Sequence, residues 1–180
     1  MTNQQTVLDK RAPMPSAPMK YKTDGSVDWG NMWDSFCVLA QEGGPPHRKT
    51  LLDAPAQPHS KSVLYQQVVA ELVRGIWEVS GLMAQPHTPG WLAITCPDQG
   101  MAGWLAEAIQ TENVVARAEG TQLLVPVGAE FTVKGEIKNV ITAVAKTTHY
   151  WKEHLPPAVK TTLAWQARFG WLKQQFSGRR

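Results

Sequence analysis

Three kinds of residue or segment are scarce in this chain, and each scarcity narrows the class of protein. Only two of the 180 residues are cysteines, Cys37 and Cys96, too few for a disulfide-stapled secreted scaffold or a four-thiolate zinc site. No uncharged apolar run reaches the roughly 18 residues of a membrane-spanning helix. The first 20 residues also lack the apolar centre of a signal peptide. We therefore expect a cytoplasmic protein.

Acidic side chains are absent from the end of the chain. Residues 154–180 contain five basic residues and no aspartate or glutamate, whereas residues 1–153 contain 13 basic and 15 acidic residues. The net charge of +3 therefore combines a slightly acidic body with a basic C-terminal segment. Hydrophobic residues make up 43% of the chain, which is typical of a folded protein, and the length suits one domain with extensions.

The apolar periodicity divides the chain into three parts. Residues 1–26 predict a flexible tail, residues 27–154 a single α+β domain, and residues 155–180 a basic amphipathic helix. Within the domain, helices are predicted from Asp28 to Gly43 and over residues 65–77, separated by a proline-rich loop.

The block from residue 91 to residue 151 reads β-α-β-β-α. Its elements are the strand GWLAITC, a helix capped by Asp98, two strands around residues 119–120, and a helix from 136 to 151. This order supplies five of the six elements of a ferredoxin-like unit. We predict an α+β fold, partly ferredoxin-like, in which helices cover one face of a small mixed sheet and the N-terminal helices extend the helical layer.

The segment THYWKEH, residues 148–154, gathers two histidines, a glutamate and two aromatic rings. On a regular α-helix each residue advances by about 100°, so His149 and Glu153 share one side while His154 points elsewhere. The sequence therefore offers His149 and Glu153 as ligands of a divalent metal ion, completed by groups from loops. The alternative is that His149 flanks the core and Glu153 is solvated.

Two other segments carry candidate catalytic or anion-binding groups. Cys96 precedes a predicted helix N-terminus, which would stabilise a thiolate, although a buried, inert cysteine is the alternative. His47, Arg48 and Lys49 follow two prolines in EGGPPHRK, so a stiffened loop would present them to a phosphate or carboxylate unless they are simply solvated. An enzyme hypothesis uses Cys96, His47 and His149 as catalytic residues.

Gly100 and Gly103 form the pattern G-x-x-G, which also occurs in the backbone-clamping loop of KH domains. In those domains the loop joins two helices, whereas here the glycines open a helix directly after a strand. We therefore expect helix packing and capping to account for them.

The basic C-terminal segment carries an apolar stripe at positions i, i+4, i+7 and i+11. The stripe consists of Trp165, Phe169, Leu172 and Phe176. The other aromatic and basic residues in the same stretch are Arg168, Trp171 and Lys173. Such a helix can dock on its own domain, on a partner protein, on an anionic membrane or on nucleic acid. Docking on its own domain buries the stripe without a second molecule, but it leaves Trp171, on the polar side, unexplained.

The sequence favours a ligand-binding or protein-binding regulatory module whose contact surface is this helix. The expected partner is another protein or a second copy of the chain, ahead of a membrane surface or nucleic acid. The alternative is a small enzyme that depends on a metal or a thiol.

Overall fold

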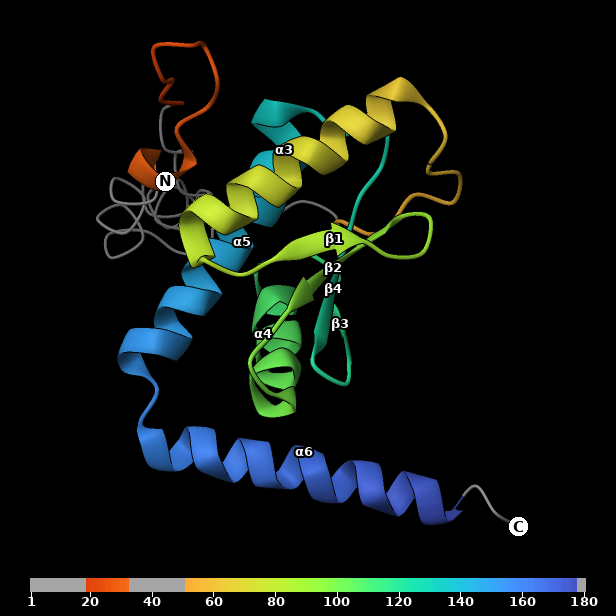
Figure 1. The fold of residues 1–180 in the computed structure, drawn as a ribbon, viewed down its shortest axis with the longest axis vertical. Coiled ribbons are helices and arrows are strands. Elements are labelled where there is room, and N and C mark those ends of the chain that lie inside the picture. Colours follow the sequence, from red (N-terminus) through yellow and green to blue (C-terminus); the bar gives the residue numbers. More distant parts are fainter. Residues whose placement is uncertain (1–18, 33–50, 178–180) are drawn as a thin grey trace, which may run out of the picture.

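The computed structural model describes residues 19–32 and 51–177, with side chains up to Ala167. It confirms the α+β prediction: three helices and a four-stranded sheet build the body, and a long C-terminal helix crosses its base (Figure 1). Residues 1–18 and 33–50 lie outside the described residues, and with them most of the helix predicted after Asp28.

The sheet has the strand order β1-β2-β4-β3. The strands are β1 (Ala84–Pro86), β2 (Trp91–Thr95), β3 (Arg117–Glu119) and β4 (Gln122–Pro126). All three pairings are antiparallel, so the prediction of a mixed sheet is wrong. The tight turn at Gly120, with φ of +60°, returns β4 directly alongside β3, and β4 thereby separates β3 from β2.

Strand β1 was not predicted from the sequence. It occupies the edge beside β2, with Ala84 opposite Ile94 and Pro86 opposite Leu92. Three residues are too few to show an alternating pattern, and a proline argues against a strand unless the strand lies at an edge. β1 therefore precedes the predicted β-α-β-β-α block and closes its sheet on the side of β2.

Three helices share one core with the sheet: α3 (Val63–Ser80), α4 (Gln99–Thr111) and α5 (Lys138–His149). Apolar residues at helical spacing along these three helices line the core, whereas Trp77, near the end of α3, is 52% exposed. Asp98 caps α4 as predicted, because its Oδ1 accepts a hydrogen bond of 2.9 Å from the Met101 N–H.

The N-terminal segment 19–32 packs against α3. The side chain of Trp29 is 2% exposed and fills the space over Gly75, where a Cβ atom would lie 3.0 Å from the indole. Trp29 Nε1 donates a hydrogen bond of 2.8 Å to Glu71, and Arg74 Nη1 donates one of 2.8 Å to the carbonyl of Val27. One buried ring and a set of polar contacts therefore tie this segment to the body.

The chain continues from α5 into the C-terminal helix through a change of helix type. The π-helical segment η1 (Val133–Ile137) precedes α5, and η2 (Tyr150–His154), also π-helical, follows it. Leu155 is extended, and α6 (Pro157–Ser177) begins two residues later, confirming the predicted C-terminal helix. Within the described residues, none of the helices combines the length and hydrophobicity needed to cross a bilayer.

Candidate functional site

The first part of α6 contacts the body through the backbone of α4. A Cβ atom built on Gly100 would lie 2.6 Å from the Ala164 nitrogen and 2.8 Å from the Leu163 carbonyl carbon. The two helices can approach this closely only because residue 100 has no side chain. A Cβ atom at Gly103, one turn along α4, would have no neighbouring atom within 4 Å. The packing role expected of the glycines is therefore confirmed for Gly100.

Trp165 lies on a different side of α6 from this contact. Leu163 and Ala164 are half-buried against α4, whereas Trp165 is 54% exposed. At about 100° per residue, Trp165 lies roughly 150° around the helix from the midpoint of Leu163 and Ala164. The contact with the body therefore uses a different face of α6 from the one that begins the predicted aromatic stripe.

A cleft of about 510 Å³ lies between α6 and the start of α4. One wall is Pro97, Asp98 and Gln99, and Thr121 of the β3–β4 turn lies beside them. The wall contributed by α6 contains Lys160, Thr161, Ala164 and Trp165. Trp165 therefore belongs both to the exposed side of α6 and to the rim of this cleft.

An aromatic cluster holds the segment that leads into α6. The ring of Tyr150 stacks on Trp104 of α4, with centroids 5.8 Å apart and an interplanar angle of 9°. Trp151 is 6% exposed and also contacts Trp104, at 5.5 Å between centroids. Lys152 Nζ donates a hydrogen bond of 2.6 Å to the Ser80 carbonyl at the end of α3. The segment η2 is thus fixed to both α4 and α3.

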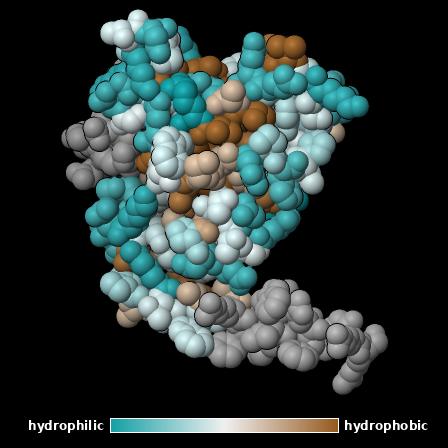
Figure 2. All heavy atoms as spheres, viewed as in Figure 1, coloured by the Kyte–Doolittle hydropathy of each residue, from teal (hydrophilic) through white to brown (hydrophobic). Residues whose placement is uncertain are grey.

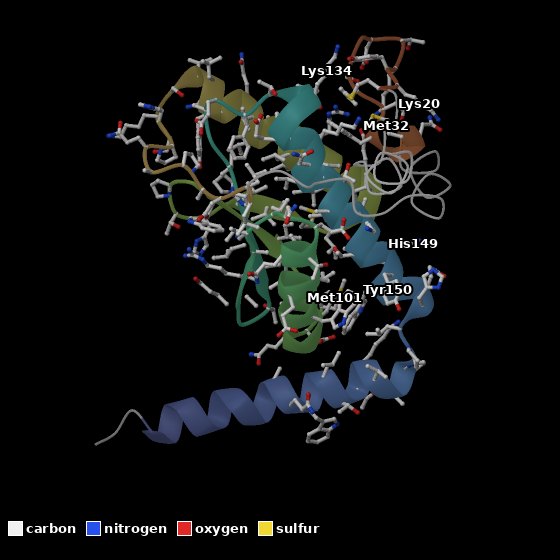
Figure 3. The ribbon with its side chains drawn as sticks, turned by 180° about the vertical axis from the view of Figure 1, so that it is seen from behind. Lys20, Met32, Met101, Lys134, His149 and Tyr150 are labelled. Carbon is white, nitrogen blue, oxygen red and sulfur yellow. The ribbon has the colours of Figure 1, made fainter. Side chains whose placement is uncertain are left out.

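The predicted positions of the two histidines need correction. The expectation that His154 points away from His149 assumed a regular α-helix, but η2 is π-helical, and the Leu155 N–H donates to the Tyr150 carbonyl at 3.1 Å. This wider turn brings the His149 and His154 rings together, with centroids 5.3 Å apart. Figure 3 shows His149 and Tyr150 at the end of α5, before α6 begins. Glu153 is exposed.

Cys96 lies between β2 and α4, as predicted, but its environment disfavours a thiolate. The residue is 3% exposed. Burial raises the pKa of the Cys96 thiol to about 12, and the negative charge of Asp98 adds to the rise. The thiol is therefore protonated at neutral pH, which removes the property on which a nucleophilic role depends.

The described residues contain only part of the predicted site. Among them, no three histidine, cysteine, aspartate or glutamate side chains are grouped so that they could hold a metal ion. The predicted anion-binding residues His47, Arg48 and Lys49 lie outside the described residues. The same holds for the side chains of Arg168, Phe169, Trp171, Leu172, Lys173 and Phe176.

Comparison with protein-family models and with curated protein sequences finds no match for this chain.

Proposed function

We propose that the chain is a protein-binding module and that α6 is its contact surface. The observation that carries the proposal is the orientation of α6: it contacts α4 through Leu163 and Ala164 and leaves Trp165 exposed on another face. The alternative was that α6 docks on its own domain, which requires no second molecule. The contact that α6 makes with its own domain leaves Trp165 exposed.

The stripe that begins at Trp165 continues along α6. The helix continues to Ser177, and at about 100° per residue positions 169, 172 and 176 fall within roughly 40° of Trp165. Positions 168 and 173, an arginine and a lysine, fall about 60° and 80° to either side of Trp165. The sequence thus places an apolar stripe between two basic positions on a helix that projects from the body (Figure 1).

This pattern favours a partner with a particular surface chemistry. An amphipathic helix binds by laying its apolar stripe into a hydrophobic groove, and basic residues beside the stripe favour a groove with an acidic rim. Residues 154–180 contain no acidic residue, so the α6 helices of two copies repel each other electrostatically. The proposal is therefore a different protein with an acidic, apolar groove, rather than a symmetric pairing of two α6 helices.

A photo-cross-linking experiment tests the proposal. A photoreactive phenylalanine analogue replaces Trp165 in the full chain, expressed in its own cells. The matched control carries the analogue at Leu64, which is 62% exposed at the beginning of α3, where Figure 2 shows hydrophobic surface. We expect one specific protein adduct from position 165 and none from position 64. Mass spectrometry then identifies the adduct.

Truncation provides the second part of the test. Removing residues 168–180 keeps the contact between α6 and Gly100, so the body stays folded, but it removes most of the stripe. We expect the adduct at position 165 to disappear while the circular dichroism of the body is retained. An adduct that survives this truncation contradicts the proposal.

Two further measurements separate the other classes of partner. Binding to phosphatidylserine vesicles without any protein adduct would indicate a membrane surface instead. Binding to single-stranded or duplex DNA that weakens steeply with salt would indicate nucleic acid.

A further inference from the structure

The π-helical turn η2 brings two imidazole rings, those of His149 and His154, into contact. His149 and His154 are five residues apart, a spacing that a regular α-helix spreads by about 140° around its axis. In η2 the backbone hydrogen bond from Leu155 to Tyr150 spans five residues, and the centroids of the two rings lie 5.3 Å apart with an interplanar angle of 68°. Such turns are rare and are often found at functional sites.

The separation of the rings matches the geometry of a shared ion. Zinc lies about 2.0–2.1 Å from a ligating imidazole nitrogen, and the ring centroid lies about 1 Å further on. Two imidazoles at a tetrahedral angle around one ion therefore have centroids about 5 Å apart. The observed 5.3 Å agrees with this spacing.

The surroundings of the pair allow an ion to enter. His154 is exposed and His149 is half-buried at the end of α5. The Tyr150 ring lies 5.4 Å from His154 and stacks on Trp104 at 5.8 Å, which fixes the backbone between the two histidines. The ligand positions are therefore held by the packed aromatic cluster and do not depend on a free loop.

We propose that His149 and His154 form a binding site for a divalent transition-metal ion such as Zn²⁺, Ni²⁺ or Cu²⁺. Neutral imidazole nitrogens suit these ions, whereas Mg²⁺ and Ca²⁺ require oxygen ligands. Two protein ligands leave the remaining coordination positions to water or to a donor from another molecule. The site shares His149 with the predicted pair of His149 and Glu153, and it is independent of the proposed role of α6.

Bound metal also has a structural consequence. An ion that needs both rings binds the π-helical turn and does not bind the α-helical register, in which the rings diverge. By mass action it stabilises η2, and with it the packing of Tyr150 on Trp104.

The test uses the full chain without an affinity tag. Zn²⁺ is titrated by calorimetry, and Cu²⁺ is examined by electron paramagnetic resonance, which reports the number of nitrogen ligands. We expect one ion per chain, two nitrogen ligands for Cu²⁺ and no response to Mg²⁺. His149→Gln and His154→Gln should each abolish tight binding. Circular dichroism verifies that both variants remain folded.

The matched control keeps the pair and removes the other three histidines. A chain carrying His47→Gln, His59→Gln and His87→Gln together should bind Zn²⁺ and Cu²⁺ as the unchanged protein does. Loss of binding in this triple variant overturns the proposal, because another histidine would then be a ligand. Absence of binding by the unchanged chain, or equal binding by His154→Gln, also overturns it.

Discussion

The substitution Gly100→Ala tests how α6 is attached to the body. A Cβ atom at residue 100 would lie 2.6 Å from the Ala164 nitrogen and 2.8 Å from its Cα, and both are backbone atoms that no side-chain rotation can move. An ordinary contact needs about 3.4 Å or more, so α6 must shift as a whole or lose this contact. Forced overpacking of this kind costs about 1–3 kcal/mol.

The loss should appear in α6 before it appears in the body. Amide hydrogen exchange over residues 159–167 measures the local opening of the docked turns. A cost of about 1–3 kcal/mol corresponds to exchange that is roughly 5- to 150-fold faster. Amides of β2 and β4, in the centre of the sheet, should exchange at nearly unchanged rates, because these strands pair with other strands of the sheet.

Gly103→Ala is the matched control on the same helix. Its added methyl group meets no atom within 4 Å. We expect this variant to be more stable by up to about 1 kcal/mol, because alanine favours the helix over glycine. If Gly100→Ala leaves both stability and exchange in α6 unchanged, or if Gly103→Ala is equally damaging, the close contact between α4 and α6 is refuted.

Three further predictions concern the body. Trp29→Ala should lower the free energy of unfolding, measured in urea, by about 3–5 kcal/mol, because it empties a buried site. Trp77→Ala, at an exposed site, should change that free energy by about 0.5 kcal/mol or less. Similar losses in the two variants would contradict the docking of segment 19–32. Lys146→Met should lower the free energy of unfolding by about 1–3 kcal/mol. The Lys146 ammonium lies 2.5 Å from the buried carboxylate of Glu112, and the substitution leaves that carboxylate without its cation. An unchanged urea midpoint would count against this ion pair. Cys96 should resist iodoacetamide at pH 8 until the chain unfolds, as followed by peptide mapping, and rapid alkylation of the native chain would refute its burial. Because the pKa of Cys96 rises from 9.0 to about 12 on folding, its contribution to stability is complete below pH 9 and is lost as the pH rises toward 12.

Much of the fold followed from local pattern. The buried stripes of α3, α4 and α5 recur at the helical period, and the apolar strand GWLAITC is bounded by a glycine and a proline. Asp98 capped its helix as predicted, because capping depends on neighbouring residues alone. Strand β1 was missed because its three residues gain their hydrogen bonds from β2 and carry no pattern of their own.

The candidate site was less predictable, because its decisive features are non-local. The helix rotation used for THYWKEH was that of an α-helix, and nothing in those seven letters signals a π-helical turn. The packing of Tyr150 and Trp151 on Trp104, about 46 residues earlier in the chain, accompanies that turn. The burial that raises the pKa of Cys96 likewise comes from the assembled core.

The sequence by itself determined the helices, the apolar stripes of α3, α4 and α5, the β-hairpin and the uneven distribution of charge, because these depend on residue order and period. The tertiary structure decided which face of α6 meets the body, because that contact depends on Gly100 of α4 lying beneath Ala164. It also decided that His149 and His154 lie together and that Cys96 is buried, because backbone register and desolvation are set by distant parts of the chain.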